Sequence, residues 1–396
     1  MSVAFEVGRL PRIAFGPGSR RRLPGLAATY GSRVLLVTGA RSLRASVHGR
    51  ALHASFAAHG LDVATLNVTG EPSPERVDEA VRELRPRGID VVVGIGGGSA
   101  LDTAKAVAGL LPGGRSVMDH LEEVGRGVPY EGPAVPCIAV PTTAGTGSEA
   151  TRNAVLSRRG AGAFKRSFRH EALVPQWAVV DPDLLETCPR ELIASDGLDA
   201  LTQLLESYVS LRAGPFTDAL AEHGLGAVRE GLLPWYEGTG DARAVRGSMA
   251  YAALLSGLTL ANAGLGVVHG LSAPLGASFP VPHGAACGTL LAAATTANVA
   301  ALRARDPAGP ALGRYARAWA ILAGALTSPP PREAPERLAA LLEEWITRLE
   351  IPRLASFGVR EADVARVVTE GRAGSTKTNP IVLTDAETTA ILRARL

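Results

Sequence analysis

An aspartate, a glutamine and two histidines in the second half of the chain have the residue types and spacing of a metal site. Asp199 and Gln203 are four residues apart, so on a helix they share one face. His269 and His283 each stand beside glycines or prolines, at breaks between apolar segments. Each histidine alone is better explained as an ordinary core residue. Together, one carboxylate and two imidazoles are a natural donor set for a divalent transition metal.

Cys287 follows His283 by four residues and can share a helix face with it. Its sequence neighbours are apolar, which favours a core thiol over a metal ligand. We therefore expect that replacing Cys287 by alanine leaves the metal content unchanged.

A glycine-rich turn in the first half of the chain could bind a phosphate. The apolar run 91–95 predicts a buried strand, and Gly96, Gly97, Gly98 and Ser99 follow it directly. A helix then begins, with Asp102 in its first turn. Glycines allow backbone N–H groups to approach an anion closely, and the helix dipole favours the negative charge. A tight turn without a ligand would show the same pattern, so the turn alone is weak evidence.

A second polar loop follows the next predicted strand. Four hydroxyl side chains lie within seven residues, at Thr142, Thr143, Thr146 and Ser148. In a doubly wound sheet, the loops at the carboxyl ends of neighbouring strands meet in one crevice, where nucleotides bind. We expect both loops at that edge, in contact with pyrophosphate and ribose.

The elements that position these residues differ between the two halves of the chain. Up to about residue 182, short apolar runs alternate with helix-like stretches, which is typical of a doubly wound parallel sheet. The predicted strands cover 5–7, 12–15, 34–39, 62–66, 91–96, 133–140 and 177–182, and the predicted helices between them cover 46–59 and 74–84. Ser73 is the expected N-cap of the second of these helices.

Beyond about residue 189, strand signals disappear and alanine- and leucine-rich segments with helical periodicity follow. The predicted helices cover 191–210, 215–232, 242–264, 284–305, 311–326, 334–349 and 361–370. We therefore predict a dinucleotide-binding α/β domain over residues 1–187 and a helical metal- and substrate-binding domain over residues 188–396.

Composition excludes several classes of partner. The chain has 41 basic and 38 acidic residues, and a net charge of +3 is too balanced to indicate nucleic acid or an anionic membrane. No apolar run reaches the roughly 18 residues of a membrane span. No signal peptide is recognisable. Three widely spaced cysteines do not suggest a disulfide framework. We expect a cytoplasmic enzyme that acts on a small molecule.

The motifs together resemble those of the iron-activated, or group III, alcohol dehydrogenases, whose fold is shared by dehydroquinate synthase and glycerol dehydrogenase. The resemblance covers nearly the whole chain. The motifs are Gly96-Gly97-Gly98-Ser99 with Asp102 and Lys105, Pro141-Thr142-Thr143 with Gly145-Thr146-Gly147-Ser148-Glu149, Asp181-Pro182, Gly197-Leu198-Asp199-Ala200-Leu201-Thr202, Val268-His269-Gly270 and Pro282-His283-Gly284.

The resemblance implies an enzyme that transfers hydride between NAD(P)(H) and an alcohol/aldehyde or ketone pair, and it implies a homodimer. It implies that both loops bind the cofactor, and that Asn153, Lys165 and Leu184 contact it as well. It also implies that Asp199, His269 and His283 are catalytic because they hold Fe²⁺ or Zn²⁺, which polarises the substrate oxygen.

Two positions depart from the family pattern. Gln203 stands where the family usually has a fourth metal ligand, a histidine, so we expect a weaker site with the glutamine carbonyl as the fourth donor. Ala273 stands where many members have a histidine that relays a proton, so the proton must leave by water, the cofactor ribose or another group.

Three alternatives remain open from the sequence. The first is a metal-independent reductase of the maleylacetate type that acts on a carboxylated substrate, although such enzymes generally lose the aspartate and Asp199 is present. The second is a lyase like dehydroquinate synthase, which would show no net redox turnover. The third is a non-catalytic nucleotide sensor.

The choice of cofactor is predicted from the end of the strand at 34–39. Family members that prefer NAD commonly have an aspartate at the position of Gly39, and this chain continues with Arg41 and Ser42. No carboxylate would repel a 2′-phosphate there, and Arg41 with Ser42 could hydrogen-bond it. We therefore expect NADP(H) to be favoured over NAD(H).

Overall fold

The structure is a computed structural model that describes residues 4–39, 47–160, 162–326 and 329–396. These residues form two compact units. One unit is Gly8–Cys188, and the other is Pro189–Leu396 together with the N-terminal segment that ends at Val7. In that segment the Phe5 ring stacks on Phe216 of the helical unit, with ring centroids 6.5 Å apart.

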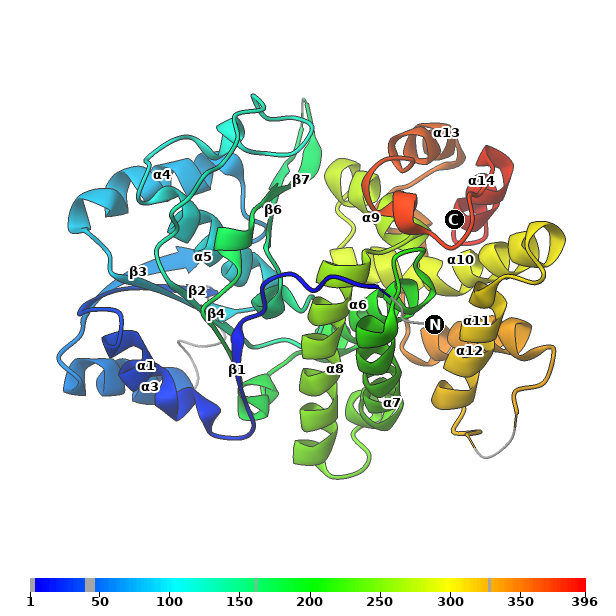
Figure 1. Cartoon of the computed structure of the whole chain (residues 1–396), viewed down its shortest axis with the longest axis horizontal. Helices are drawn as coiled ribbons and strands as arrows, with labels where there is room; N and C mark the ends of the chain where they lie inside the picture. Colours follow the sequence, from blue (N-terminus) through cyan, green and yellow to red (C-terminus); the bar gives the residue numbers. More distant parts are fainter. Residues whose placement is uncertain (1–3, 40–46, 161, 327–328) are drawn as a thin grey trace. The chain divides into compact units, whose positions relative to one another are not determined.

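The unit Gly8–Cys188 is built on a six-stranded parallel sheet with the strand order β1-β8-β5-β4-β2-β3. Its strands are β1 (Arg12–Phe15), β2 (Arg33–Gly39), β3 (Asp62–Val68), β4 (Val91–Gly96), β5 (Cys137–Pro141) and β8 (Trp177–Val180). The helices beside it are α1 (Leu23–Ala28), α3 (Val47–Ala58), α4 (Pro74–Leu84) and α5 (Gly98–Leu110). The predicted doubly wound sheet followed by a helical part is confirmed (Figure 1).

Both faces of the sheet are covered, which explains why its central strands are continuous apolar runs. In β2, Leu35 and Val37 pack into the cluster that contains α4 and α5. Val34 and Leu36 of the same strand pack into the cluster that contains α1 and α3. Successive side chains of a strand point to opposite faces, so the residues at the middle of such a strand are apolar on both faces.

Two predicted strands in this unit differ from the structure. Residues 5–7 form no strand, and the run 133–140 becomes extended sheet only from Cys137. Prolines at 133 and 136 lack the N–H that a sheet ladder needs, so β5 begins after them. The N-cap prediction is confirmed, because the Ser73 side chain accepts a hydrogen bond from the backbone N–H of Arg76 at the start of α4.

The sequence prediction missed an antiparallel hairpin of β6 (Asn153–Arg158) and β7 (Phe164–Arg169). In β7 only Phe164 and Phe168 are buried, and charged residues stand between them. Phe164, Arg166 and Phe168 share one face of the strand, and the charged Arg166 interrupts the apolar alternation that identifies a half-buried strand. The signal was therefore absent from the hydrophobic pattern.

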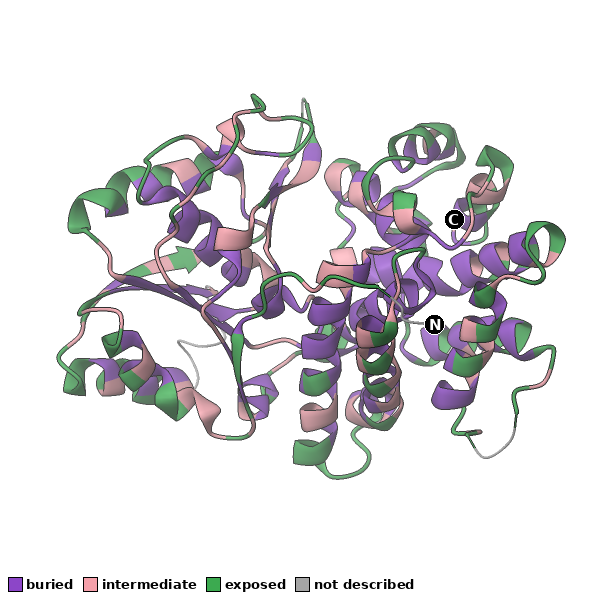
Figure 2. Ribbon diagram, in the orientation of Figure 1, coloured by how far each residue is buried: buried purple, intermediate pink, exposed green. Residues whose placement is uncertain are grey.

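The unit Pro189–Leu396 is helical, and Figure 2 shows α6 and α10 as mostly buried. Its helices are α6 (Arg190–Val209), α7 (Pro215–Glu237), α8 (Ala242–Ala263), α9 (Val267–Ser278), α10 (His283–Arg305), α11 (Pro310–Leu322), α12 (Ala334–Arg348), α13 (Glu361–Glu370) and α14 (Asp385–Arg393). The sequence prediction missed α9 and α14. Pro274 stands inside α9, and α14 is short and polar, so each lacks the signal of a regular amphipathic helix.

Among the described residues, α10 alone is long and apolar enough by itself to cross a membrane, with a mean hydropathy of 1.5 in its most apolar window. Of that window, 78% is buried inside the structure. The bent pair α8 and α9 passes the same test only when taken together, across a bend of 102°. Helix α10 is therefore apolar on all sides because it is a core helix of the helical unit.

Candidate metal and cofactor sites

The glycine-rich turn and the threonine-rich loop lie against each other, as predicted. The backbone N–H of Thr142 donates to Gly96 O at 3.0 Å. A Cβ added to Gly97 would lie 3.3 Å from Cγ2 of Thr143, and one added to Gly98 would lie 2.8 Å from Cγ2 of Thr146. Only glycine leaves room for this approach. Helix α5 therefore begins beside a row of hydroxyl groups, and a helix start of this kind offers backbone N–H groups to an anion.

These loops lie at the topological switch point of the sheet. The chain leaves β2 towards β3 on one side, and it leaves β4 towards β5 on the other side. A Cβ on Gly96 would lie 3.4 Å from the backbone nitrogen of Gly39, the last residue of β2. Ligands of doubly wound folds bind at such a point, outside the carboxyl ends of the strands. Arg41 and Ser42, predicted to bind the cofactor, lie outside the described residues.

Asp102 and Ser148 have partners within the protein. Oδ1 of Asp102 accepts a hydrogen bond from Ser148 Oγ at 2.5 Å, and Oδ2 accepts one from the N–H of Val155 at 3.0 Å. The buried ammonium of Lys105 lies 3.1 Å from Asp102 Oδ1 and donates to Thr151 Oγ1 at 3.0 Å. These contacts fix the loop after β5 to helix α5, so Asp102 and Lys105 position the predicted cofactor loops.

The structure places the remaining predicted cofactor residues on other elements. Asn153 begins β6, and Lys165 lies in β7, where its ammonium pairs with Glu71 at 2.7 Å. In the hairpin register Asn153 stands opposite Arg169, whereas Lys165 stands opposite Ser157, so the two residues are at different ends of the ladder. Leu184 is buried in the short helical turn Pro182–Leu185. Their contacts with a cofactor stay predictions.

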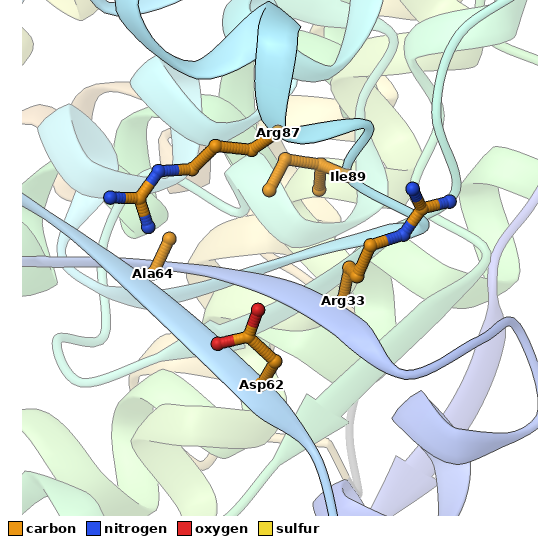
Figure 3. Close-up of a pocket in the computed structure, with 5 residues that line it drawn as sticks. All are labelled: Arg33, Asp62, Ala64, Arg87 and Ile89. Atoms are coloured by element: carbon orange, nitrogen blue, oxygen red, sulfur yellow. The ribbon is translucent and has the colours of Figure 1, made fainter.

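A pocket of about 220 Å³ opens at the opposite, amino-terminal ends of the strands of the same sheet (Figure 3). It is lined by Arg33, Asp62, Ala64, Arg87 and Ile89. Arg33 and Asp62 begin their strands, so this pocket lies at the amino ends of β2 and β3, away from the glycine-rich turn. The Arg33 guanidinium also binds Asp90, which it holds at a pKa of about 2. We assign this pocket no part in the chemistry.

The candidate metal site lies within the helical unit and begins on one face of α6. Asp199, Gln203 and Glu206 follow each other at intervals of four and three residues, and all three are buried. Sequence reasoning identified Asp199 and Gln203 but missed Glu206. The sequence spacing could have identified Glu206, because it lies on the same face of α6 as Asp199 and Gln203.

The first histidine comes from α9, whose start is fixed by side chains from distant segments. Val267 N–H donates to Asn379 Oδ1 at 3.1 Å, and Val268 N–H donates to Glu206 Oε1 at 2.7 Å. These bonds satisfy donors that a helix start leaves open. A Cβ on Gly270 would collide with Thr376 Oγ1, so glycine is needed directly after His269.

The second histidine is the first residue of α10. A Cβ on Gly284 would collide with the backbone oxygen of Ser195 in α6, so glycine after His283 lets the two helices approach closely. His283 therefore lies over the same stretch of α6 that carries Asp199. In each of the two histidine–glycine pairs, glycine follows the histidine because a larger residue would collide with a neighbouring segment.

Four donor atoms converge at this place. Asp199 Oδ1 lies 3.3 Å from His269 Nε2 and 3.8 Å from His283 Nε2. Cys287 Sγ lies 3.7 Å from His269 Nε2 and 3.8 Å from His283 Nε2. One ligand atom from each of the four residues lies within 4.8 Å of all the others. Side-chain exposure is 2% for Asp199, 7% for His269 and 29% for His283, so His283 faces the more open side.

The electrostatics of the cluster suit a cation. Oδ1 of Asp199 is buried and has no hydrogen-bond partner. Burial opposes its ionisation, but His283 and His269 outweigh burial and hold the pKa of Asp199 at about 2. His269 Nδ1 lies 2.7 Å from Glu206 Oε2, to which it can donate. When the ring is neutral and donates through Nδ1, its Nε2 lone pair faces Asp199 Oδ1, and a cation between the two atoms would attract both. The residues therefore fit a divalent metal.

The two positions that depart from the family pattern, Gln203 and Ala273, both lie in the helical unit. Gln203 lies beside the donor atoms, but its Nε2 donates to Asp199 Oδ2 at 3.0 Å, and its Oε1 accepts from Ser256 Oγ at 2.7 Å. Ala273 lies in α9 one turn after His269, and it carries no group that could hold a proton.

Comparison with known proteins decides the family. The model of the iron-containing alcohol dehydrogenases matches residues 11–182, and the model of the C-terminal part of Fe-containing alcohol dehydrogenases matches residues 193–396. The chain belongs to this family. The resemblance predicted from the motifs is confirmed.

One relative of the chain is a 1-propanol dehydrogenase of Citrobacter freundii. The two are 38% identical over a segment that covers 63% of this chain and 61% of the relative. An NAD-dependent methanol dehydrogenase of Bacillus methanolicus is 30% identical over 98% of both chains. Among solved structures, a 1,3-propanediol oxidoreductase superposes with a TM-score of 0.89 and 28% identity, with all of both chains covered. The fold is therefore that of the family throughout.

Proposed function

We propose that this family member is an NAD(P)(H)-dependent alcohol dehydrogenase, or aldehyde reductase, that requires a divalent metal at Asp199, His269 and His283. The observation that carries the proposal is the buried, unpartnered Oδ1 of Asp199, which lies 3.3 Å and 3.8 Å from the Nε2 atoms of the two imidazoles. Such an oxygen is costly to bury unless a cation compensates it. The names of the relatives suggest a short primary alcohol as substrate.

The metal, when bound, supplies a positive charge that polarises the substrate oxygen and stabilises a developing alkoxide, and the nicotinamide supplies or accepts the hydride. The protein's own residues orient and hold these groups. In the neutral ring that a metal requires, Glu206 would accept from Nδ1 of His269 and so leave the lone pair on Nε2. The turn Gly96–Ser99 and the hydroxyls of Thr143 and Thr146 bind the pyrophosphate and ribose.

The alcohol proton needs an exit, because Ala273 offers no acceptor. We propose that it leaves through water or the cofactor ribose. A change at this position therefore alters the proton path without altering the metal donors.

The metal-independent alternative is not favoured, because Asp199 is present and its carboxylate is supported by Gln203. A lyase or a nucleotide sensor would retain the cofactor loops. Neither would convert an alcohol with a steady change in the absorbance of the reduced cofactor.

The expected preference for NADP(H) has no support from the comparisons, and one relative is named as NAD-dependent. What favours use of NADP(H) is the absence of a carboxylate at Gly39, the last residue of β2. We keep this preference as a proposal for direct test.

We also propose a homodimer in the cytoplasm. Strand β1 is an edge of the sheet, and its Ile13 and Phe15 side chains are 42% and 43% exposed. Exposed apolar residues on an edge strand are suited to pairing with another copy.

The test is a panel of short alcohols and aldehydes assayed with NAD(H) and NADP(H). The proposal predicts continuous oxidation or reduction of the cofactor with at least one short alcohol–aldehyde pair. Cofactor binding without turnover across the panel would contradict it.

A further inference from the structure

Cys287 has a neighbourhood that its apolar sequence context does not predict. It is one helical turn after His283 in α10, and its side chain is buried. On one side it belongs to the apolar cluster of the C-terminal helices. On the other side its Sγ faces the Nε2 atoms of both imidazoles of the candidate metal site.

We propose that the thiolate of Cys287 is the fourth protein donor to the divalent ion. The inference rests on the proposed metal site, and it assigns to that site a sulfur donor. When the metal binds, the thiol proton passes to solvent and a metal–sulfur bond forms, as in other cysteine metal sites.

The distances between the donor atoms carry the proposal. Tetrahedral ligands bound at about 2.0–2.1 Å for O and N and about 2.3 Å for S are about 3.3 Å apart as O/N pairs and about 3.6 Å apart as N/S pairs. Cys287 Sγ lies 3.7 Å from His269 Nε2 and 3.8 Å from His283 Nε2. Asp199 Oδ1 lies 3.3 Å and 3.8 Å from the same two nitrogens. Both sulfur–nitrogen distances and the contact between Asp199 and His269 are close to the tetrahedral values, whereas Asp199 Oδ1 lies farther from His283 Nε2, at 3.8 Å. All four ligand atoms lie within 4.8 Å of one another.

Gln203 has a different function in this arrangement. Its carbonyl oxygen, which would have to bind the metal, accepts the hydrogen bond from Ser256. Its amide nitrogen donates to the Oδ2 atom of Asp199 and so leaves Oδ1 available. Gln203 therefore orients the carboxylate, and the sulfur completes the donor set.

A sulfur donor changes the metal that the site prefers. Thiolate is a soft ligand, and a set of one oxygen, two nitrogens and one sulfur suits zinc in tetrahedral geometry. The proposal therefore predicts that zinc displaces ferrous iron from this chain, although its family is named for iron.

The decisive measurement is the absorption spectrum of the full-length protein reconstituted with Co²⁺. A cobalt–thiolate bond gives a charge-transfer band in the near ultraviolet, which oxygen and nitrogen donors do not give. We expect the band in the wild type and in Cys137→Ala, a control at a buried cysteine in β5. Cys287→Ala and Cys287→Ser should lose the band, and their dissociation constants for Zn²⁺ should rise about tenfold or more.

A second variant keeps the test valid if Cys287→Ala is poorly folded. Gln203→His combined with Cys287→Ala supplies a nitrogen donor from α6 in place of sulfur. It should bind Zn²⁺ more tightly than Cys287→Ala alone, without the charge-transfer band. The wild-type spectrum is itself a test that needs no variant.

Three outcomes distinguish the sulfur donor from the metal site itself. A wild-type cobalt spectrum without the band, or a band that persists in Cys287→Ala, overturns the sulfur donor. If Asp199→Asn abolishes Zn²⁺ binding while Cys287→Ala binds it as the wild type does, the sulfur donor is wrong and the proposed metal site stands. If Asp199→Asn binds Zn²⁺ unchanged, the metal site itself is wrong.

Discussion

His269 and Glu206 are joined by a short contact of 2.7 Å between the ring nitrogen Nδ1 and the carboxylate oxygen Oε2. The other oxygen of Glu206 accepts the N–H of Val268, so one carboxylate fixes both the ring and the start of its helix. A neutral ring that donates through Nδ1 must present the lone pair of Nε2 to the candidate metal position. Glu206 is therefore a positioning residue for the metal site.

Replacing Glu206 by glutamine tests this role. The substitution keeps the shape but removes the negative charge and one of the two acceptors, so the orientation of His269 becomes less defined. We expect the affinity for Zn²⁺ or Fe²⁺ to fall about 10- to 100-fold. Titration of metal-free protein with each ion measures it. Glu222→Gln, in α7 beside Tyr208 and Arg317, is the matched control and should bind metal normally. Unchanged metal affinity in Glu206→Gln would show that the contact is only structural.

Glu149 in the threonine-rich loop predicts a pH dependence of stability. It is buried, its Oε1 has no hydrogen-bond partner, and burial raises its pKa from 4.5 to about 7. Between these two values the folded protein keeps a proton that the unfolded chain releases. The free energy of unfolding therefore falls as the pH rises through this window, by roughly 3 kcal/mol for this group.

Glu149→Gln removes the titration, so its unfolding free energy should fall less than that of the wild type between pH 5 and pH 8. Urea unfolding at the two pH values measures the difference. Glu79→Gln, exposed on α4, should behave as the wild type does. Parallel pH profiles for the wild type and Glu149→Gln would refute the assignment.

The choice of cofactor is testable at Gly39. Among the described residues, a Cβ at this position would meet no atom within 4 Å, so these residues leave room for the first carbon of a side chain. Gly39→Asp should raise the KM for NADP(H) several-fold more than the KM for NAD(H), because the carboxylate repels a 2′-phosphate. Gly39→Ala adds the carbon without the charge and should leave the ratio unchanged. A wild type with several-fold higher kcat/KM for NAD(H) would exclude the NADP(H) preference.

Much of the fold was predictable because its elements carry regular hydrophobic patterns. The buried runs of β2 and β4 identify a sheet covered on both faces, and the glycines after β4 identify the turn. The hairpin β6–β7 was missed because only Phe164 and Phe168 anchor its second strand. Helix α9 was missed because Pro274 interrupts its pattern, and Glu206 and Asn379 stabilise its first turn from distant parts of the chain.

The metal site was predictable in its residue types but less so in their roles. Asp199, His269 and His283 converge as the motifs imply. The position of Cys287 depends on the packing of α10 against α6 at Gly284, which a local apolar pattern does not encode. The bond of Gln203 to Ser256 depends on α8, because Ser256 stands 53 residues further along the chain.

We propose that the enzyme needs a divalent ion bound by Asp199, His269 and His283 for activity. The most direct measurement is the metal content of purified enzyme, assayed before and after chelation together with the rate of aldehyde reduction. We expect about one divalent ion per chain, loss of activity in step with loss of the ion, and recovery when Zn²⁺ or Fe²⁺ is returned. Full activity in chelated enzyme that is shown to be metal-free would contradict it.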